Sequence, residues 1–134
     1  MIAADTNLLV YLLLTGEHTA AAERVLEQDA EWAVPLLWRS ELRNVLALYL
    51  RRGLLAYEAA LEVFQQAELL VQGREYEVDT AQVMACVSES SCSAYDCEFV
   101  SLAHELKVPL VTSDRKVIAT FPSLAVSPED FGRK

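Results

Sequence analysis

Short apolar segments alternate with longer amphipathic segments along the whole chain, and this alternation restricts the fold more than any other feature. The short segments Ile2–Ala4, Trp32–Val34, Pro109–Thr112 and Leu124–Val126 have the length and composition of buried strands. Tyr76–Val78 has the pattern of an edge strand. Signals for tight hairpins are almost absent, so consecutive strands need helical connections. The sequence therefore predicts an α/β fold with a parallel sheet that helices cover on both faces.

The longer segments carry the start and stop signals of helices. Gly53 and Gly73 follow two of them and end them, while Asp79 and Ser93 precede two others as caps. Residues 5–7 (DTN) are predicted to be a polar turn after the first strand, and the closing SPEDF an acidic tail. The predicted helices are Glu17–Gln28, Trp38–Arg52, Tyr57–Val71, Thr80–Val87, Ala94–Leu106 and the single turn Val117–Thr120.

Composition and charge narrow the class of protein. The 134 residues are 53% hydrophobic and 23% charged, which is typical of a compact globular protein, and we expect a single domain over residues 1–134. The net charge of -9 repels nucleic acid and anionic membranes, so a phosphate-bearing substrate would need local cations or a bound metal. The apolar run Leu8–Leu14 is too short to cross a bilayer and lacks the basic flank of a secretory signal. We therefore expect a cytoplasmic protein with no membrane partner.

The cysteines are also consistent with a cytoplasmic protein. Cys86, Cys92 and Cys97 match no zinc-ligand spacing, and their odd number argues against a secreted disulfide framework. We expect them to be small packed side chains in a reducing environment.

Four acidic residues are predicted to meet at one edge of the sheet. Asp5 and Asp114 each follow a strand directly, while Glu41 and Asp96 lie in the first turns of predicted helices. In an open parallel sheet, ligands bind where the carboxyl ends of the strands and the following helices converge. Carboxylates so close together need a positive partner to stay ionised, and Mg²⁺ or Mn²⁺ is the usual one. Such a site activates water for attack on phosphorus, which is hydrolytic nuclease chemistry.

Each acid also has a purely local interpretation, which the sequence leaves open. Asp5 suits a turn, Asp114 suits a cap after its strand, and Asp96 completes a capping box (SAYD) with its own helix start. Glu41 could be a solvated residue held between the arginines two positions before and after it. The coincidence of all four at one sheet edge favours a shared site.

These acids lie in stretches that resemble the PIN-domain ribonucleases, in particular the VapC-like toxins of toxin–antitoxin modules. The stretches are AADTNLLVYLL, SELRNVLALYLRRG, SAYDCEFVSLAHELKVPLVTSD and the closing SPEDF, and together they span essentially the whole chain. The resemblance implies a three-layer α/β/α fold with a parallel sheet of four or five strands. It also implies an Mg²⁺-dependent endoribonuclease, with Mn²⁺ as a substitute ion, that forms a homodimer and is inhibited by an antitoxin lying across the active cleft.

The resemblance also gives roles to individual residues. Asn7 matches the polar position that steadies the first acid, and Thr112 matches a hydroxyl two positions before the last acid. Arg115 and Lys116 stand where the family often has a further acid, which leaves the number of metal ions open. The metal ligands and catalytic groups that the resemblance implies are Asp5, Glu41, Asp96 and Asp114.

Four cations lie close in sequence to these acids. Arg39 and Arg43 flank Glu41 on one predicted helix, and Arg115 and Lys116 directly follow the last acid. We predict that they hold RNA phosphates near the metal.

Two other classes of function stay open. A catalytically silent PIN-like module that binds RNA or a protein partner would need no Mg²⁺, so calorimetric measurement of Mg²⁺ binding separates it from a nuclease. A phosphoryl-accepting domain would use Asp5 as the acceptor. That reading lacks the second acid of a D-x-D motif, because Asn7 stands there, and labelling by acetyl phosphate would be its test.

Overall fold

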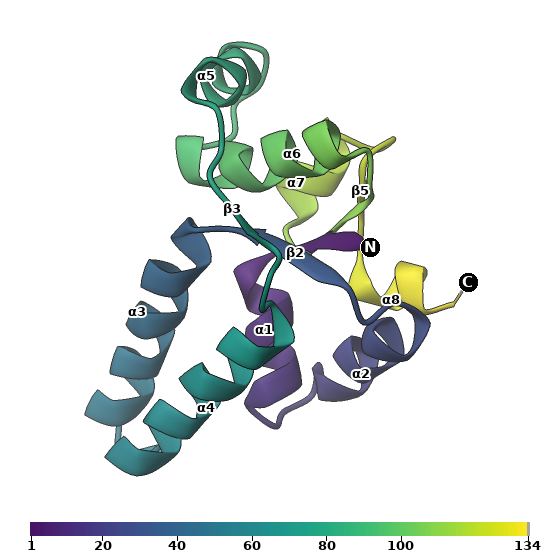
Figure 1. Cartoon of the computed structure of the whole chain (residues 1–134). Helices are drawn as coiled ribbons and strands as arrows, with labels where there is room; N and C mark the ends of the chain where they lie inside the picture. Colours follow the sequence, from purple (N-terminus) through teal and green to yellow (C-terminus); the bar gives the residue numbers. More distant parts are fainter. Residues whose placement is uncertain (134) are drawn as a thin grey trace.

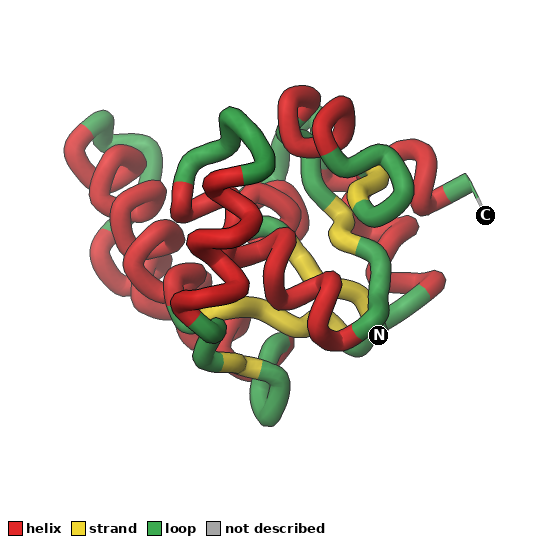
Figure 2. Tube along the Cα trace, turned by 90° about the horizontal axis from the view of Figure 1, so that it is seen from above, coloured by secondary structure: helices red, strands yellow, loops and turns green. Residues whose placement is uncertain are grey.

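A five-stranded, all-parallel sheet forms the centre of the computed structural model, which describes residues 1–133 (Figures 1 and 2). The strand order is β3-β2-β1-β4-β5, and each neighbouring pair runs parallel. This arrangement confirms the predicted α/β class and the predicted edge position of the third strand. The strands are β1 (Ile2–Ala4), β2 (Trp32–Pro35), β3 (Glu75–Tyr76), β4 (Leu110–Val111) and β5 (Ala125–Val126).

Helices cover both faces of the sheet, and the alternation of side chains along β1 separates the two layers. Ile2 and Ala4 pack with α1 to α4 on one face, whereas Ala3 packs with α5, α6 and α7 on the other, as Figure 1 shows. Trp32 and Trp38 are fully buried in the first layer. The helices are α1 (Thr6–Leu13), α2 (Thr19–Gln28), α3 (Leu37–Arg51), α4 (Tyr57–Leu70), α5 (Thr80–Ser88), α6 (Ala94–Leu106), α7 (Arg115–Thr120) and α8 (Pro128–Gly132).

The expected polar turn at residues 5–7 is wrong, because α1 begins there. Asp5 is the N-cap with extended backbone, and the helix starts at Thr6 and runs through the apolar stretch after it. Leu8, Leu9 and Val10 are all buried, so the helix is enclosed on several sides and has few polar positions after Asn7. An amphipathic pattern could not reveal such a helix.

The expected acidic tail is also wrong, because residues 128–132 form the short helix α8. Ser127 caps it by accepting a hydrogen bond from the Asp130 N–H, and Pro128 occupies the first turn, where its missing N–H costs nothing. The Gln28 side-chain amide of α2 donates to the Gly132 carbonyl at 2.6 Å. The end of the described chain is therefore docked on α2.

The remaining elements follow their sequence signals closely. Asp79 and Ser93 cap α5 and α6 through their side chains, and α6 has the predicted bounds. Gly53 and Gly73 have φ values of 69° and 81°, a left-handed conformation that favours glycine after α3 and α4. None of the helices within residues 1–133 is both long and apolar enough to cross a membrane.

Candidate active site

The carboxyl ends of β1 and β4 place Asp5 beside Thr112. Ala4 of β1 pairs with Val111 of β4, so the residues that follow them are neighbours at the same edge of the sheet. The Asp5 N–H donates to the Val111 carbonyl at 3.1 Å, and the buried Thr112 hydroxyl donates to Asp5 Oδ2 at 2.6 Å. One oxygen of the half-buried Asp5 is thus fixed by a neighbouring strand.

Asp114 caps a helix, as the local interpretation of the sequence proposed, and it also lies at the predicted sheet edge. Its Oδ1 accepts hydrogen bonds from the N–H groups of Lys116 and Val117, at 2.9 and 3.2 Å, and so caps α7. Its own N–H donates to Thr112 Oγ1 at 3.1 Å, which holds the residue against the same threonine that contacts Asp5. Capping therefore orients Asp114 and does not remove it from the sheet edge.

Glu41 reaches this edge from α3 and is held by Thr6. The Thr6 hydroxyl donates to Glu41 Oε1 at 2.6 Å, and the threonine is only 4% exposed. The interpretation of Glu41 as held between Arg39 and Arg43 is wrong. Residues two positions apart on a helix point to different sides, and in the structure Arg39 pairs with Glu68 and Glu75 while Arg43 lies over Phe64.

Asp96 lies in the first turn of α6 and is directed by the cap of that helix. Ser93 Oγ accepts a hydrogen bond from the Asp96 N–H at 3.1 Å. The serine thus forms the predicted cap through the backbone of Asp96, and the Asp96 carboxylate lines the cleft described next.

All four predicted acids line one cleft of about 250 Å³. They come from the end of β1, from α3, from α6 and from the loop after β4. Asp5 and Asp96 also border a smaller void of about 10 Å³ together with Thr112. The structure therefore brings together the acids that the sequence placed at one sheet edge. The other residues that line the cleft are Thr6, Asn7, Asn44 and Val45.

Thr6 and Asn44 were missed by the sequence reading. Thr6 directly follows Asp5 where a strand passes into a helix, and a hydroxyl at that junction was a usable signal once the helix was recognised. Asn44 lies three residues after Glu41 on α3, which is the helical spacing of a shared face.

The cleft is strongly anionic. Burial raises the pKa of Asp5 above its ordinary range, and the charges of Asp96 and Asp114 raise it further, while the hydrogen bond from Thr112 acts in the opposite direction. Among residues 1–133, none of the four acids forms an ion pair with a Lys, Arg or His side chain.

Glu41 shares this environment. Burial raises the pKa of the Glu41 carboxyl, the hydrogen bond from Thr6 lowers it, and the charges of Asp5 and Asp96 raise it. Glu98 on α6 contributes a further repulsion, and burial raises the pKa of its own carboxyl. A cation in the cleft would relieve this repulsion between carboxylates.

The donor atoms of the cleft suit a hard divalent cation. They are carboxylate oxygens and the side-chain amides of Asn7 and Asn44, and Mg²⁺ and Mn²⁺ prefer oxygen ligands. As the side chains stand in residues 1–133, no three His, Cys, Asp or Glu residues are close enough to ligate one ion together. Direct ligation by one or two carboxylates, with the others acting through water, is the mode of binding that fits.

A family model for the PIN domain matches residues 2–122, a span that contains all four acids. The chain belongs to the PIN-domain family. The match ends before β5 and α8, so these last two elements are known from the structure alone.

Known proteins with similar sequences and folds agree with this assignment. The chain is 27% identical over 126 residues to Ribonuclease VapC3 of Pyrobaculum aerophilum, covering 92% of this chain and 96% of that protein. It superimposes on PAE2754 of the same organism with a TM-score of 0.76 and 20% identity, over 98% of this chain and 87% of the other. A toxin–antitoxin complex from Klebsiella pneumoniae contains a chain that matches with a TM-score of 0.72 and 20% identity, over 96% and 98%.

Arg39 and Arg43, which flank Glu41 in the sequence of this PIN domain, contact residues outside the acidic cleft. Arg39 donates from Nε and Nη2 to both oxygens of Glu75, at 2.7 and 3.0 Å, and from Nη1 to Glu68 at 2.9 Å. Arg43 lies over the ring of Phe64, 5.3 Å from its centroid. Within the described chain, neither arginine lines the acidic cleft.

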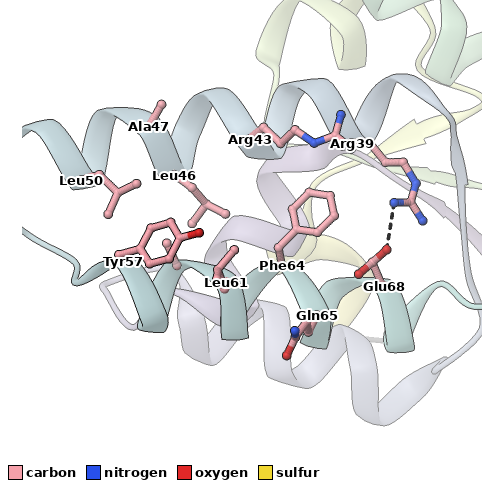
Figure 3. A pocket seen from close by; sticks show the side chains of 11 residues that line it. Arg39, Arg43, Leu46, Ala47, Leu50, Tyr57, Leu61, Phe64, Gln65 and Glu68 are labelled. Atoms are coloured by element: carbon pink, nitrogen blue, oxygen red, sulfur yellow. Dashed lines mark hydrogen bonds and ion pairs between the residues drawn. The ribbon is translucent and has the colours of Figure 1, made fainter.

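Arg39 and Arg43 instead line a groove between α3 and α4, of about 510 Å³. Figure 3 shows Leu46, Leu61 and Phe64 between the two helices, with the Arg39–Glu68 ion pair at one end. On the other side of the site, Lys116 Nζ donates to the Ser91 carbonyl at 2.6 Å, and Arg115 is exposed.

Proposed function

We propose that this PIN domain is a metal-dependent endoribonuclease that hydrolyses RNA phosphodiester bonds, with Asp5, Glu41, Asp96 and Asp114 as its catalytic acids. The observation that carries the proposal is the convergence of these acids, from four separate elements, in one cleft without a protein cation. The similarity to a protein named Ribonuclease VapC3 supports RNA as the substrate.

The proposed cofactor is Mg²⁺, with Mn²⁺ as a substitute. When bound, such an ion neutralises charge on the phosphate and lowers the pKa of a water molecule. Asp5 would be presented to the ion by Thr112, and Glu41 by Thr6, each through one fixed carboxylate oxygen. The remaining acids would hold and orient the attacking water.

Substrate contacts are proposed for the exposed cations at the rim. Arg115 and Lys116 begin α7 directly after Asp114, so they are placed to meet phosphates of an RNA strand entering the cleft. Arg43 is a more distant candidate. Arg39 is already bonded to two glutamates, so we propose for it the role of holding the α3–α4 pair together.

The proposed protein partner is an antitoxin, as in the toxin–antitoxin complex that this fold resembles. Exposed apolar side chains on and between α3 and α4, among them Leu54, Tyr57 and Leu61, form an apolar surface that a partner segment could cover. Co-expression with the product of a neighbouring small open reading frame tests this. Loss of the complex in Leu61→Asp, with cleavage retained, would support the proposed surface, whereas a complex unaffected by this change would count against it.

A cytoplasmic location and a homodimeric state complete the proposal. Light scattering of the purified chain gives its molar mass, and a mass near 14.9 kDa would refute the dimer.

Cleavage of RNA by the purified protein is the direct test of the enzymatic proposal. We expect cleavage with Mg²⁺, none with EDTA, and a loss of at least about 100-fold in Asp5→Asn and Asp96→Asn. Asp79→Asn is the matched control, because Asp79 caps α5 outside the cleft. Binding of RNA without cleavage and without uptake of Mg²⁺ would instead identify a silent PIN-like module.

A further inference from the structure

Thr6 is one of three buried polar side chains among the described residues, together with Ser101 and Thr112. Two of the three donate to acids of the cleft, at 2.6 Å in each case: Thr112 to Asp5 and Thr6 to Glu41. The two hydroxyls therefore have equivalent roles, because each donates to one acid of the cleft. Of these two hydrogen bonds, the one from Thr6 to Glu41 connects the segment that follows β1 with α3.

The backbone around Thr6 leaves its hydroxyl little freedom. Thr6 is the first residue of α1, and the Leu8 N–H donates to the Asp5 carbonyl at 3.0 Å, which closes the turn around it. As a β-branched residue enclosed to 4% exposure, threonine is restricted at χ1. The donor is therefore held rigidly, one residue from Asp5.

Glu41 by contrast has three rotatable side-chain bonds and projects from a helix surface that is half-exposed at this position. With Oε1 held by Thr6, its other oxygen is the one free to meet a ligand in the cleft. Because Asp5 and Thr6 are adjacent in the chain, the same short segment sets the positions of both carboxylates.

We propose that Thr6 is a positioning residue whose hydroxyl fixes Glu41 relative to Asp5, so that the two carboxylates present a preformed pair of oxygens to a divalent cation. This inference rests on the proposed metal-dependent function and adds to it a residue that acts through Glu41. The hydroxyl is the active group, and the methyl group only fills space.

Calorimetric binding of Mn²⁺ to the full chain tests the role of the hydroxyl. Thr6→Val keeps the side-chain shape and should weaken Mn²⁺ binding by about 10-fold or more, as is usual for loss of a hydrogen bond that orients a metal ligand. Thr6→Ser restores the donor and should bind as the wild type does. The exposed Thr80 supplies the control Thr80→Val, which should change nothing.

A double-mutant cycle separates positioning from general support of the fold. In a Glu41→Ala background, Thr6→Val should cost no further Mn²⁺ affinity, because the group that Thr6 orients is gone. An equal loss in both backgrounds, or a Thr6→Val protein that binds Mn²⁺ like wild type, would overturn the inference. Thermal unfolding in EDTA verifies that each variant is folded, and Thr6→Ala replaces Thr6→Val if valine is not accommodated.

The cycle also distinguishes this inference from the proposed function. A wild-type protein that neither binds Mn²⁺ nor cleaves RNA refutes the nuclease proposal and this inference together. A wild-type protein that does both, with Thr6→Val unchanged, refutes the role of Thr6 alone.

Discussion

Asp5 combines enclosure with electrostatic repulsion in the cleft. Its carboxylate is enclosed at the end of β1, receives one hydrogen bond from Thr112, and is close enough to Asp96 and Asp114 for their charges to raise its pKa. Without a cation, ionised Asp5 therefore destabilises the fold. Function and stability are in conflict at this residue.

We predict that Asp5→Asn is more stable than wild type in EDTA at neutral pH, by about 1 to 3 kcal/mol, because a charged group in an unfavourable site is removed. Burial raises the pKa of Asp5 in the folded state, so the protonated carboxyl is the form that the fold favours. The stability that this form contributes is fully present below the ordinary pKa of 3.8 and is lost as pH rises through the raised pKa. The advantage of the variant should therefore grow as pH rises above about 4. Thermal unfolding of both proteins in EDTA across pH measures it, and an advantage that is constant with pH would contradict the prediction.

At the scale of elements, Arg39 and Glu75 connect α3 to the edge strand β3. The Trp38 indole N–H also donates to Glu75 at 2.6 Å, and Glu68 brings α4 into the same network. The Arg39 guanidinium, in turn, lies over the rings of Trp38 and Phe64. A two-residue strand at the sheet edge thus receives much of its support from side chains.

We predict that Glu75→Gln lowers the free energy of unfolding by about 1 to 3 kcal/mol at pH 7, because it removes a paired charge that accepts three hydrogen bonds. Arg39 lowers the pKa of Glu75, so the contribution is present above the ordinary value of 4.5 and is lost as pH falls through the lowered pKa. The difference from wild type should shrink in acid. Urea unfolding measures it, with the exposed neighbour Glu77→Gln as control, and a difference that persists at low pH would refute the charged origin of the effect.

The sequence predicted the elements whose signals are local. Asp79 and Ser93 correctly marked the starts of α5 and α6, respectively, because a cap is formed within four residues. Helix α1 was missed because it is enclosed on several sides and has few polar positions, whereas helix recognition depends on a polar face opposite an apolar one. The edge strand β3 begins one residue earlier than predicted, at Glu75, and ends two residues earlier, at Tyr76. Trp38 and Arg39 donate hydrogen bonds to Glu75 there, and such tertiary contacts leave no local signal in the sequence.

For the candidate site, the sequence predicted which acids line the cleft better than it predicted the contacts of those acids. The rule for parallel sheets was enough to place Asp5 and Asp114 at one edge. The hydrogen bond from Thr6 to Glu41 joins residues 35 positions apart, and no local pattern encodes such a pair. The hydrogen bond from Arg39 to Glu75 is likewise a tertiary contact. The sequence does not show this contact, so its spacing from Glu41 alone made Arg39 a candidate for RNA binding.

For the whole molecule, the net charge of -9 makes divalent cations a general source of stability, and the cleft makes one site specific. We predict that Mg²⁺ or Mn²⁺ raises the unfolding temperature of wild type, with a gain of about 2.7 kcal/mol at 100 times the dissociation constant. Asp96→Asn should lose most of this gain, and the distant acid variant Asp79→Asn should keep it. An equal gain in both variants, measured by calorimetry at fixed ionic strength, would assign the effect to non-specific screening.

The same net charge requires that RNA binding depend on a few local cations. We predict that Arg115→Ala weakens binding of a cleavage-resistant RNA several-fold and reduces the slope of log affinity against log salt by about 0.7, the value for one lost phosphate contact with a single strand. Arg24→Ala, which removes an exposed arginine of α2, is the matched control. Fluorescence anisotropy at several salt concentrations gives both quantities. If the two variants lose the same slope, the RNA is attracted by overall charge, and the rim beside Asp114 is not its binding surface.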